Sequence, residues 1–440
     1  SVAIYAIAGY ALTEASAAPT TAFGGLYIVD SFAVFLKVLI LAGAAVSAVL
    51  ALPYLRHSAT ARFEYPVLIL ISALGMCMMV SANDLLSLYL GLELQSLAAY
   101  VLAAFHRNER RSSEAGLKYF VLGALASGVL LYGISLVYGF TGTTSFAALH
   151  DIVRGGPARD IGVLFGLVFI LSGLAFKIAA VPFHMWTPDV YEGAPTPVAA
   201  FFSSAPKAAA MGLLVRVAVD AFGGMTLDWR QIVTFVAIAS MLLGAVGAIG
   251  QTNIKRLLAY SSINNVGFAL IGLAAGTREG VTGVLFYMAV YLAMTLGSFL
   301  VVLQMRSADG KPVETIASLS GLSRTRPALA AALAIFMFSL AGIPPLLGFW
   351  PKFAVFQAAV DANLLVLATI GVVASVIGAY YYLRVIKSVY FDEPAPAFAA
   401  SDSRVNGAMI GIAALFCSPL GMLAITPLVA AAGRAAQSLL

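Results

Sequence analysis

Three lysines stand where apolar stretches of the chain are interrupted by proline. Lys177 comes five residues before Pro182. Lys207 directly follows a proline inside an apolar run, and Lys352 directly follows the segment Gly348-Phe349-Trp350-Pro351. Burial disfavours the charged form of a lysine, so a buried lysine can bind and release a proton at moderate cost. Backbone groups left free at a helix break can hold water beside it. Structural lysines at three such places would be a coincidence, so the pattern predicts a row of proton-binding sites.

Glu93 is the only acid near the middle of an apolar run, here residues 84–105. Its helical face also carries three hydroxyl groups, those of Tyr89, Ser96 and Tyr100. A carboxylate at membrane depth is costly unless it faces protein or water and pairs with a cation. We therefore expect Glu93 to pair electrostatically with Lys118 or Lys177. A purely structural hydrogen-bonding role is the alternative, and the cost of burial favours a functional one.

Two further titratable groups leave two interpretations open. Lys118 follows Glu114 by four residues at the start of an apolar run. It fits either the proton path or an interfacial ion pair whose long side chain reaches the membrane surface. His184 is the only histidine at a proline break. An unperturbed imidazole titrates at about pH 6.5, which suits a relay, but the ring could equally cap free backbone groups.

The elements that position these groups must lie in lipid. The chain is 61% hydrophobic and only 10% charged, whereas soluble domains carry about 25% charged residues. Most basic residues sit in short loops, so the net charge of +5 does not indicate nucleic-acid binding. The two cysteines, Cys77 and Cys417, both lie inside apolar runs, which argues against a disulfide framework or an iron–sulfur site.

Apolar runs separated by loop signals predict an all-α, polytopic membrane protein with twelve full spans. A span needs about 20 residues, so we interpret the shorter apolar stretch at 1–12 as the remnant of a further spanning helix. The run at 328–361 is too long for one straight span and contains Pro344-Pro345, which predicts one broken helix. The full runs lie near 30–52, 64–82, 84–105, 114–139, 161–182, 198–222, 231–250, 257–275, 281–305, 328–361, 364–389 and 406–432.

Lys and Arg gather in every second loop. Because short loops rich in these residues stay on the cytoplasmic side, we assign to the inside the loops 53–63, 106–113, 183–197, 251–256, 306–327 and 390–405.

Proline breaks and span starts recur at similar offsets, which predicts an internal repeat of residues 64–222 in residues 231–389. Each unit holds five helices, so the second must be inverted relative to the first. Residues 1–63 and 390–440 flank the two units as N-terminal helices and as a C-terminal loop and helix. Prolines that merely kink packed helices are the alternative, and the shared offset favours the repeat.

The segment 177–197 reads KIAAVPFHMWTPDVYEGAPTP. It resembles the signature of antiporter-like subunits of respiratory complex I, and its MWTPDVYEGAP part resembles the subunit N type (mitochondrial chain 2) more than the two larger relatives. The resemblance covers nearly the whole chain, and four other stretches agree with it: 91–94 (GLEL), 114–119 (EAGLKY), 253–262 (NIKRLLAYSS) and 341–345 (AGIPP).

The resemblance implies a fold of about 14 transmembrane helices, of which the first is missing here. It implies that the family's proton-path residues correspond to Glu93, Lys118, Lys177, Lys207 and Lys352. It also implies a translocase in which NADH reduces quinone in partner subunits, through FMN and iron–sulfur clusters, with no cofactor and no redox chemistry in this chain. Its partners would be the other membrane and peripheral subunits, including other antiporter-like ones. The expected location is the bacterial cell inner membrane, with the mitochondrial inner membrane as the alternative.

One departure from the family pattern is Asn264-Asn265, where many relatives carry a histidine after the two serines. Asparagine cannot carry a proton at neutral pH, so water would have to relay protons at this point. Other functions remain possible on the residues alone. They are a subunit of a multisubunit cation/proton antiporter, a subunit of a photosynthetic complex that uses plastoquinone, and a membrane scaffold without transport.

Overall fold

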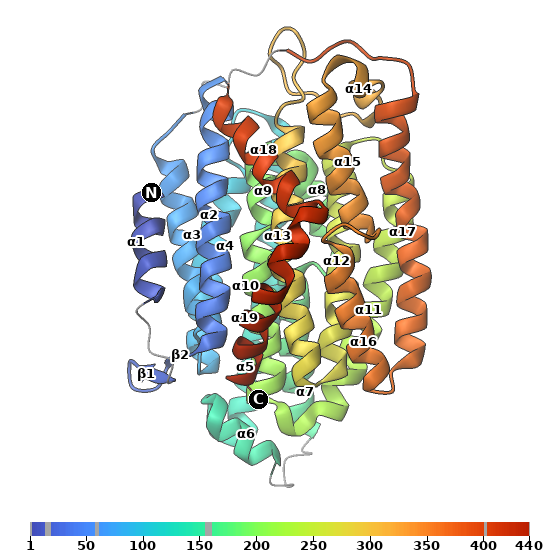
Figure 1. Ribbon diagram of the computed structural model, residues 1–440. Coiled ribbons are helices and arrows are strands. Elements are labelled where there is room, and N and C mark those ends of the chain that lie inside the picture. Colours follow the sequence, from blue (N-terminus) through green and yellow to red (C-terminus); the bar gives the residue numbers. More distant parts are fainter. Residues whose placement is uncertain (1, 14–18, 58–60, 155–160, 400–402, 440) are drawn as a thin grey trace.

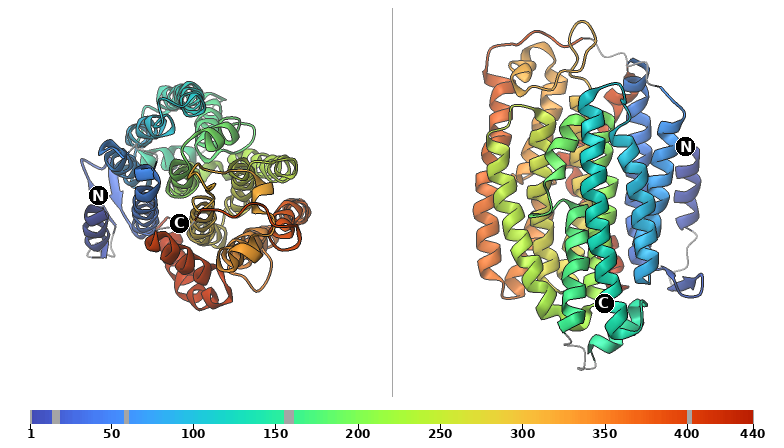
Figure 2. Two further views of the ribbon diagram at one scale, coloured as in Figure 1. Left: turned by 90° about the horizontal axis from the view of Figure 1, so that it is seen from above. Right: turned by 180° about the vertical axis from the view of Figure 1, so that it is seen from behind.

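The structure is a computed structural model that describes residues 2–13, 19–57, 61–154, 161–399 and 403–439. Long helices run side by side through the whole bundle, and most connections lie at its two ends (Figure 1). Viewed from above, the helices form a ring of pairs around inner helices, with α1 on the rim (Figure 2). Ten helical segments are long and apolar enough to cross a membrane, and four shorter apolar helices accompany them within the described residues. The prediction of an all-α, polytopic membrane protein is confirmed.

The N-terminal part and the first predicted unit are helical except for one small hairpin. The N-terminal part holds α1 (Val2–Thr13), the antiparallel strands β1 (Thr20–Ala22) and β2 (Tyr27–Val29), and α2 (Ser31–His57). The first unit holds α3 (Glu64–Val80), α4 (Leu85–Ala103), α5 (Arg110–Thr141), α6 (Phe146–Arg154), α7 (Ile161–Ile178), α8 (Trp186–Gly193), α9 (Thr196–Phe202), α10 (Ala205–Arg216) and a π-helical turn at Val217–Ala221.

The second predicted unit follows a short 3-10 turn at Gly223–Met225. It holds α11 (Thr226–Ile249), α12 (Ile254–Ala275), α13 (Arg278–Val302), a 3-10 turn at Ile316–Leu319, α14 (Leu322–Thr325), α15 (Pro327–Ala341), α16 (Phe349–Asp361) and α17 (Leu365–Phe391). The C-terminal part holds α18 (Arg404–Cys417), a 3-10 turn at Pro419–Ala424 and α19 (Ile425–Gln437). Helices α18 and α19 pack on α13, and α19 also packs on α2.

Two of the predicted spans are divided more than the sequence indicated. The run 198–222 contains a break between α9 and α10, where the Ser204 hydroxyl donates to the carbonyls of Ala200 (3.0 Å) and Phe201 (2.9 Å). Serine competes in this way for helix carbonyls, and proline fits the first turn of the next helix because it needs no N–H partner there. The run 406–432 likewise splits at Ser418-Pro419 into α18 and α19.

Close contacts between small residues join the first two helices of each unit. A Cβ atom added at Gly75 of α3 would lie 2.5 Å from the backbone nitrogen of Gln95 in α4. One added at Gly244 of α11 would lie 2.5 Å from the backbone nitrogen of Asn264 in α12. Such glycines let two membrane helices approach each other closely. The two contacts have the same sequence separation, which agrees with the repeat, and the inverted superposition itself stays a prediction.

Candidate functional site

The first broken helix lies between α7 and α8, where the chain unwinds around Pro182. A helix that ends inside the bundle leaves its last carbonyl groups without partners. The Lys207 ammonium, 2% exposed, donates to the carbonyl of Ile178 at 2.7 Å, and the Trp186 indole donates to that of Phe176 at 3.0 Å. On the far side of the break, the hydroxyl of Ser240 in α11 accepts from the backbone N–H of Val181 at 2.9 Å. The sequence therefore places Lys207 correctly beside a break, and α10 is the element that carries it there.

The second broken helix lies between α15 and α16 and holds Lys352, 5% exposed. The Lys352 ammonium donates to the carbonyls of Leu340 (3.1 Å) and Ala341 (3.0 Å), which end α15, and to the Ser375 hydroxyl at 3.4 Å. It also lies 4.4 Å from the ring centre of Phe268 in α12. The carbonyl end of a helix carries partial negative charge, which favours a cation. Lys207 and Lys352 thus occupy equivalent chemical positions at the ends of two broken helices.

Lys177, 8% exposed, faces α4 and not the carbonyls of the break. Its ammonium donates to the Ser96 hydroxyl at 2.7 Å and to the Tyr100 hydroxyl at 3.4 Å. Glu93 interacts electrostatically with Lys177, but no ion pair joins Glu93 to a lysine among the described residues. The Oε1 atom of Glu93 is buried and has no hydrogen-bond partner among the residues that the structure describes. Two of the three hydroxyls predicted to share the Glu93 face, those of Ser96 and Tyr100, therefore bind Lys177.

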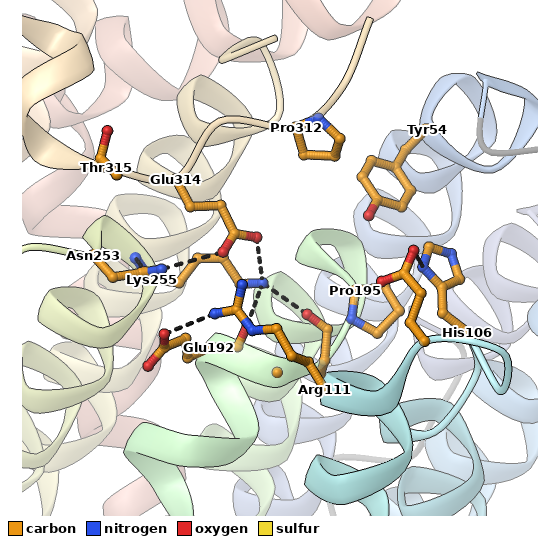
Figure 3. Close-up of a pocket in the computed structure, with 13 residues that line it drawn as sticks. Tyr54, His106, Arg111, Glu192, Pro195, Asn253, Lys255, Pro312, Glu314 and Thr315 are labelled. Carbon is orange, nitrogen blue, oxygen red and sulfur yellow. Dashed lines mark hydrogen bonds and ion pairs between the residues drawn. The ribbon is translucent and has the colours of Figure 1, made fainter. Parts of the chain in front are cut away.

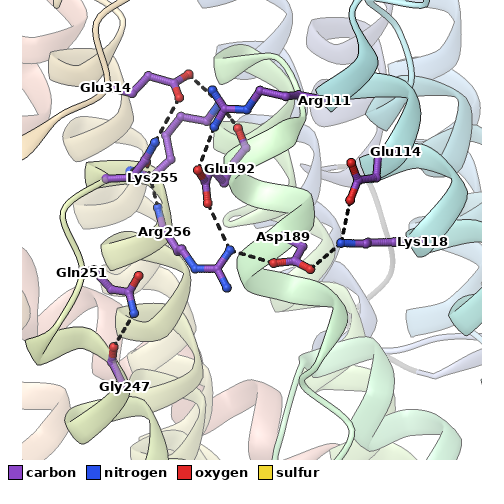
Figure 4. A network of polar contacts seen from close by, with 11 residues as sticks. Arg111, Glu114, Lys118, Asp189, Glu192, Gly247, Gln251, Lys255, Arg256 and Glu314 are labelled. Carbon is purple, nitrogen blue, oxygen red and sulfur yellow. Dashed lines mark hydrogen bonds and ion pairs between the residues drawn. The ribbon is translucent and has the colours of Figure 1, made fainter.

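Lys118 lies in a separate network of ion pairs and does not contact Glu93 (Figure 4). Its ammonium is 2.9 Å from Glu114 and 2.8 Å from Asp189 of α8, and its side chain is 42% exposed. Arg256 of α12 continues the network, with 2.7 Å to Asp189 and 3.0 Å to Glu192. The ion pair with Glu114 agrees with the interfacial interpretation of Lys118, and its place on a proton path stays a prediction.

The network keeps Asp189 ionised although the group is partly buried. Burial by itself would raise the pKa of Asp189, but hydrogen bonds from Lys118 and Arg256 outweigh it and hold the pKa below its usual range. Because Lys118 belongs to α5, Asp189 to α8 and Arg256 to α12, the network ties the first broken helix to both predicted units.

His184 lies in the turn between α7 and α8, as the sequence predicts. Its Nδ1 atom is buried and has no hydrogen-bond partner among the described residues. Neither a relay nor a capping function for His184 is decided by these contacts.

Neutral polar side chains occupy α12 in place of the histidine of many relatives. The Asn265 amide donates to the Ser261 carbonyl at 2.8 Å and accepts from the Tyr287 hydroxyl at 2.7 Å. The hydroxyls of Ser261 and Tyr382 are 2.5 Å apart, so α12, α13 and α17 are connected by one hydrogen-bonded chain. We call Ser261, Asn265, Tyr287 and Tyr382 the α12 cluster. Asn264 is not part of it, because its amide donates to the Met241 carbonyl at 2.7 Å.

Sequence reasoning missed two buried charges. Lys255, 2% exposed, was counted as a residue of an inner loop, and its position two residues after the helix-capping Asn253 was the signal that it begins a buried helix. Arg216 lies four residues before Asp220, a helical spacing at which the two side chains can pair. The Arg216 guanidinium lies 3.6 Å from the Asp220 carboxylate. The main partner of Arg216 is Asp30, whose two carboxylate oxygens lie 2.9 and 2.8 Å from Nη2 of the guanidinium. That partner is 186 residues away, so helical spacing could not reveal it.

Comparison with known proteins agrees with this geometry. The family described as NADH:quinone oxidoreductase/Mrp antiporter, TM, matches residues 82–378. NADH-quinone oxidoreductase subunit N of Rhizorhabdus wittichii is 65% identical over 441 residues, which cover 100% of this chain and 91% of the relative. The protein of the same name from Sphingopyxis alaskensis is 60% identical over 96% of this chain and 88% of the relative.

The fold also resembles the folds of solved structures. A chain of respiratory complex I from Thermus thermophilus with bound aureothin superposes with a TM-score of 0.84 and 34% identity, over 97% of this chain and 92% of that chain. A chain of the Mrp complex from Dietzia superposes with a TM-score of 0.85 over 100% of this chain and 90% of that chain, but at 24% identity, so it shows likeness of fold alone.

Two broken helices with a lysine at each carbonyl end, inside a multi-pass bundle, define an antiporter-like membrane subunit. The chain belongs to the NADH:quinone oxidoreductase/Mrp antiporter family, and within that family it groups with subunit N of NADH-quinone oxidoreductases. The resemblance carried by the segment 177–197 is thereby confirmed. The predicted location in the cell inner membrane is also confirmed, since the relatives are bacterial. Across the described residues, no cluster of three or more His, Cys, Asp or Glu side chains is suited to a metal ion.

Proposed function

We propose that this chain moves protons across the inner membrane as a subunit of NADH:quinone oxidoreductase, through an axis that contains Glu93, Lys177, Lys207 and Lys352. The observation that carries the proposal is the equivalent placement of Lys207 and Lys352 against the last carbonyls of α7 and α15. Burial disfavours a charged lysine, whereas the carbonyl dipoles favour it. These opposing effects make proton binding and release at each lysine nearly balanced, which a carrier requires.

The contacts support an order of groups along the proposed axis. Lys177 contacts Ser96 and Tyr100 on the helix that carries Glu93, and Lys207 lies at the break that ends α7. Farther on, Lys352 stacks on Phe268, which follows Asn265 of the α12 cluster by about one helical turn. Neighbouring lysines would disfavour simultaneous charges, because Coulomb repulsion is weakly screened in a low-dielectric interior. A proton that arrives at one lysine would thus promote release from the next.

Lys118 and His184 are assigned supporting positions on this axis. Lys118 would hold the inner end of α8 through Asp189, and the unpartnered Nδ1 of His184 would bind water at the first break. We also propose that NADH oxidation and quinone reduction take place in partner subunits that hold FMN and iron–sulfur clusters. The other antiporter-like membrane subunits would be direct neighbours.

Lysine replacement in the assembled complex tests the axis. Lys207→Met and Lys352→Met remove the charge and nearly preserve side-chain length. Proton transport and coupled quinone reduction should fall together in both variants, with assembly intact. Lys387→Met is the matched control, because Lys387 is 66% exposed and pairs with Asp392 at 2.6 Å outside the axis. Normal proton transport per electron pair in both axis variants would contradict the proposal.

The alternative functions have separate tests. A cation/proton antiporter subunit, which shares the fold, would show transport that depends on sodium. Copurification in mild detergent would recover flavin and iron–sulfur subunits if the proposed complex is correct. A scaffold would tolerate neutral replacement of all three lysines.

A further inference from the structure

A third lysine lies at the carbonyl end of a broken helix, and it belongs to neither proline break described above. Helix α8 ends at Gly193, and the Lys255 ammonium donates to the carbonyls of Glu192 (2.9 Å) and Ala194 (2.8 Å) (Figure 3). Its exposure of 2% equals that of Lys207. Lys255 therefore repeats the chemistry of Lys207 and Lys352 at the predicted inner end of the bundle.

Lys255 differs from the other two in having a carboxylate partner. Glu314 Oε1 lies 2.8 Å from the Lys255 ammonium, and Glu314 Oε2 accepts from the Asn253 amide at 3.2 Å. Backbone pairing holds the loop that carries Glu314 across the start of α12, since the Ile254 N–H donates to the Glu314 carbonyl at 2.8 Å. Lys255 and Glu314 both line a cavity of about 330 Å³, which also contains His106 and Arg111 (Figure 3).

Buried hydroxyl groups continue inward from Lys255. Ser262 lies seven residues further along α12, about 10 Å at the helical rise of 1.5 Å per residue. The hydroxyls of Tyr191 in α8 and Tyr291 in α13 both interact with Ser262. All three side chains are at most 2% exposed. Three buried hydroxyls that converge can pass a proton on, because a hydroxyl both donates and accepts a hydrogen bond.

We propose that Lys255 and Glu314 form a gate between the inner cavity and the proton axis, a proposal that rests on the function assigned above. In the closed state, the Glu314 carboxylate holds the Lys255 ammonium in its charged form. When the carboxylate moves away, Lys255 loses its counter-charge and gives its proton to a water molecule on the path toward the Ser262 hydroxyl. The neutral amine then takes a proton from a hydronium ion in the cavity, which becomes water. One N–H bond breaks and one forms in each cycle, so no oxidant or reductant is needed.

The Glu314 carboxylate has a structural contact besides Lys255, because it accepts from the side-chain amide of the capping residue Asn253 at 3.2 Å. Backbone bonds hold its loop, the Lys255 ammonium caps the end of α8, and the Asn253 side-chain oxygen caps α12 by accepting from two backbone N–H groups. A buried ion pair is weak evidence for stability, because desolvation of both charges offsets their attraction. The larger effect of Glu314 is therefore on the charge of Lys255.

The test uses the assembled complex in sealed membrane vesicles. Glu314→Gln keeps the size of the side chain and removes its charge. The passive proton leak across vesicles without turnover should rise severalfold, and protons transported per electron pair should fall, while quinone reduction continues. Asp309→Asn is the matched control, since it makes the same change in the same loop at an exposed pair with Lys311. A Glu314→Gln complex with the leak and coupling of the wild type would overturn the gate.

A second variant tests the carrier itself. Lys255→Met should lower proton transport and coupled quinone reduction together, without added leak, whereas transport at the wild-type level would overturn a carrier role. If Lys255→Met prevents assembly, Glu314→Asp replaces it as the second variant, because the shorter acid breaks the contact with Lys255. Glu314→Asp should then reproduce the leak of Glu314→Gln, and a normal leak would overturn the gate. The axis is judged independently by the Lys207→Met and Lys352→Met complexes. Loss of transport there with normal behaviour of the Glu314 variants would reject the gate alone.

Discussion

At both broken helices a lysine ammonium donates to carbonyls at the end of a helix, but the two lysines come from different elements. At the first break the ammonium comes from α10, since Lys207 reaches back to the Ile178 carbonyl. At the second it comes from α16 itself, since Lys352 folds back onto the end of α15. The first break also has a second buried lysine, Lys177, one residue before Ile178. Each break therefore has a cation at its carbonyl end, but a different position in the sequence supplies it.

The helix beside each break differs in charge. Helix α4, beside Lys177, carries Glu93, whereas α12, beside Lys352, carries the neutral α12 cluster. An anion nearby favours the charged form of a lysine, and neutral hydroxyls and amides do so less. We therefore expect the first break to hold a proton more strongly than the second.

Lys177→Met should have the largest effect. It removes the lysine that contacts Ser96 and Tyr100 on the helix that carries Glu93. Coupled quinone reduction and proton transport should fall together by at least about tenfold, because a positioned proton carrier contributes about 10²- to 10⁴-fold in rate. Assembly should stay intact, as judged by the recovery of the complex in mild detergent. Normal proton transport per electron pair would place Lys177 off the path.

Glu93→Gln should have an intermediate effect. The amide keeps the shape of the side chain, and Lys177 keeps its contacts to Ser96 and Tyr100. We expect a severalfold loss of proton transport, since removal of a nearby charge changes the interaction by about 1 kcal/mol or more. Glu114→Gln is the control, because Glu114 is 53% exposed and pairs with Lys118 away from Glu93. Full proton transport by a Glu93→Ala complex would remove the contrast between the two breaks.

Paired glycine replacements test whether the two units are equivalent in packing. Gly75→Ala and Gly244→Ala each place a Cβ atom 2.5 Å from a backbone nitrogen of the neighbouring helix, which cannot move aside as a flexible side chain would. Overpacking of this kind costs about 1–3 kcal/mol, so both variants should lower the thermal midpoint of the complex by similar amounts. Gly128→Ala in α5 should have little effect, since nothing lies within 4 Å of its added Cβ. Strongly unequal losses would argue against equivalent units.

Much of this contrast could be predicted from the sequence, because a proline inside an apolar run indicates a helix break and a lysine there indicates a buried charge. The breaks near Pro182 and Pro345 and the burial of Lys177, Lys207 and Lys352 needed no knowledge of tertiary contacts. What the sequence left open is which polar groups meet. Hydropathy reports depth in the membrane but not the face of a helix.

Three misses follow from that limit. Lys255 lies between two apolar runs among polar residues, which indicates a loop, whereas its carbonyl partners belong to another helix. Lys118 was considered for Glu93, although Asp189 and Glu114 hold it. The amphipathic helix α6, which buries Phe146, Leu149 and Val153 at the end of the bundle, is short and polar enough to be taken for a loop (Figure 1).

The smallest expected effect concerns the inner cavity, where His106, in the loop between α4 and α5, stacks on Tyr54 of α2. Burial lowers the pKa of His106, the nearby Glu109 carboxylate opposes this effect, and Lys255 adds to it. A depressed folded-state pKa means that the unfolded chain binds a proton more readily than the folded one. The stability that neutral His106 contributes is therefore present above its unfolded pKa of about 6.5, and it is lost as the pH falls through the lower folded-state value. The thermal midpoint of the wild-type complex should drop more between pH 7.5 and pH 5.5, roughly the range in which histidine titrates, than that of a His106→Gln complex. Equal drops would mean that His106 is protonated as easily in the cavity as in the unfolded chain.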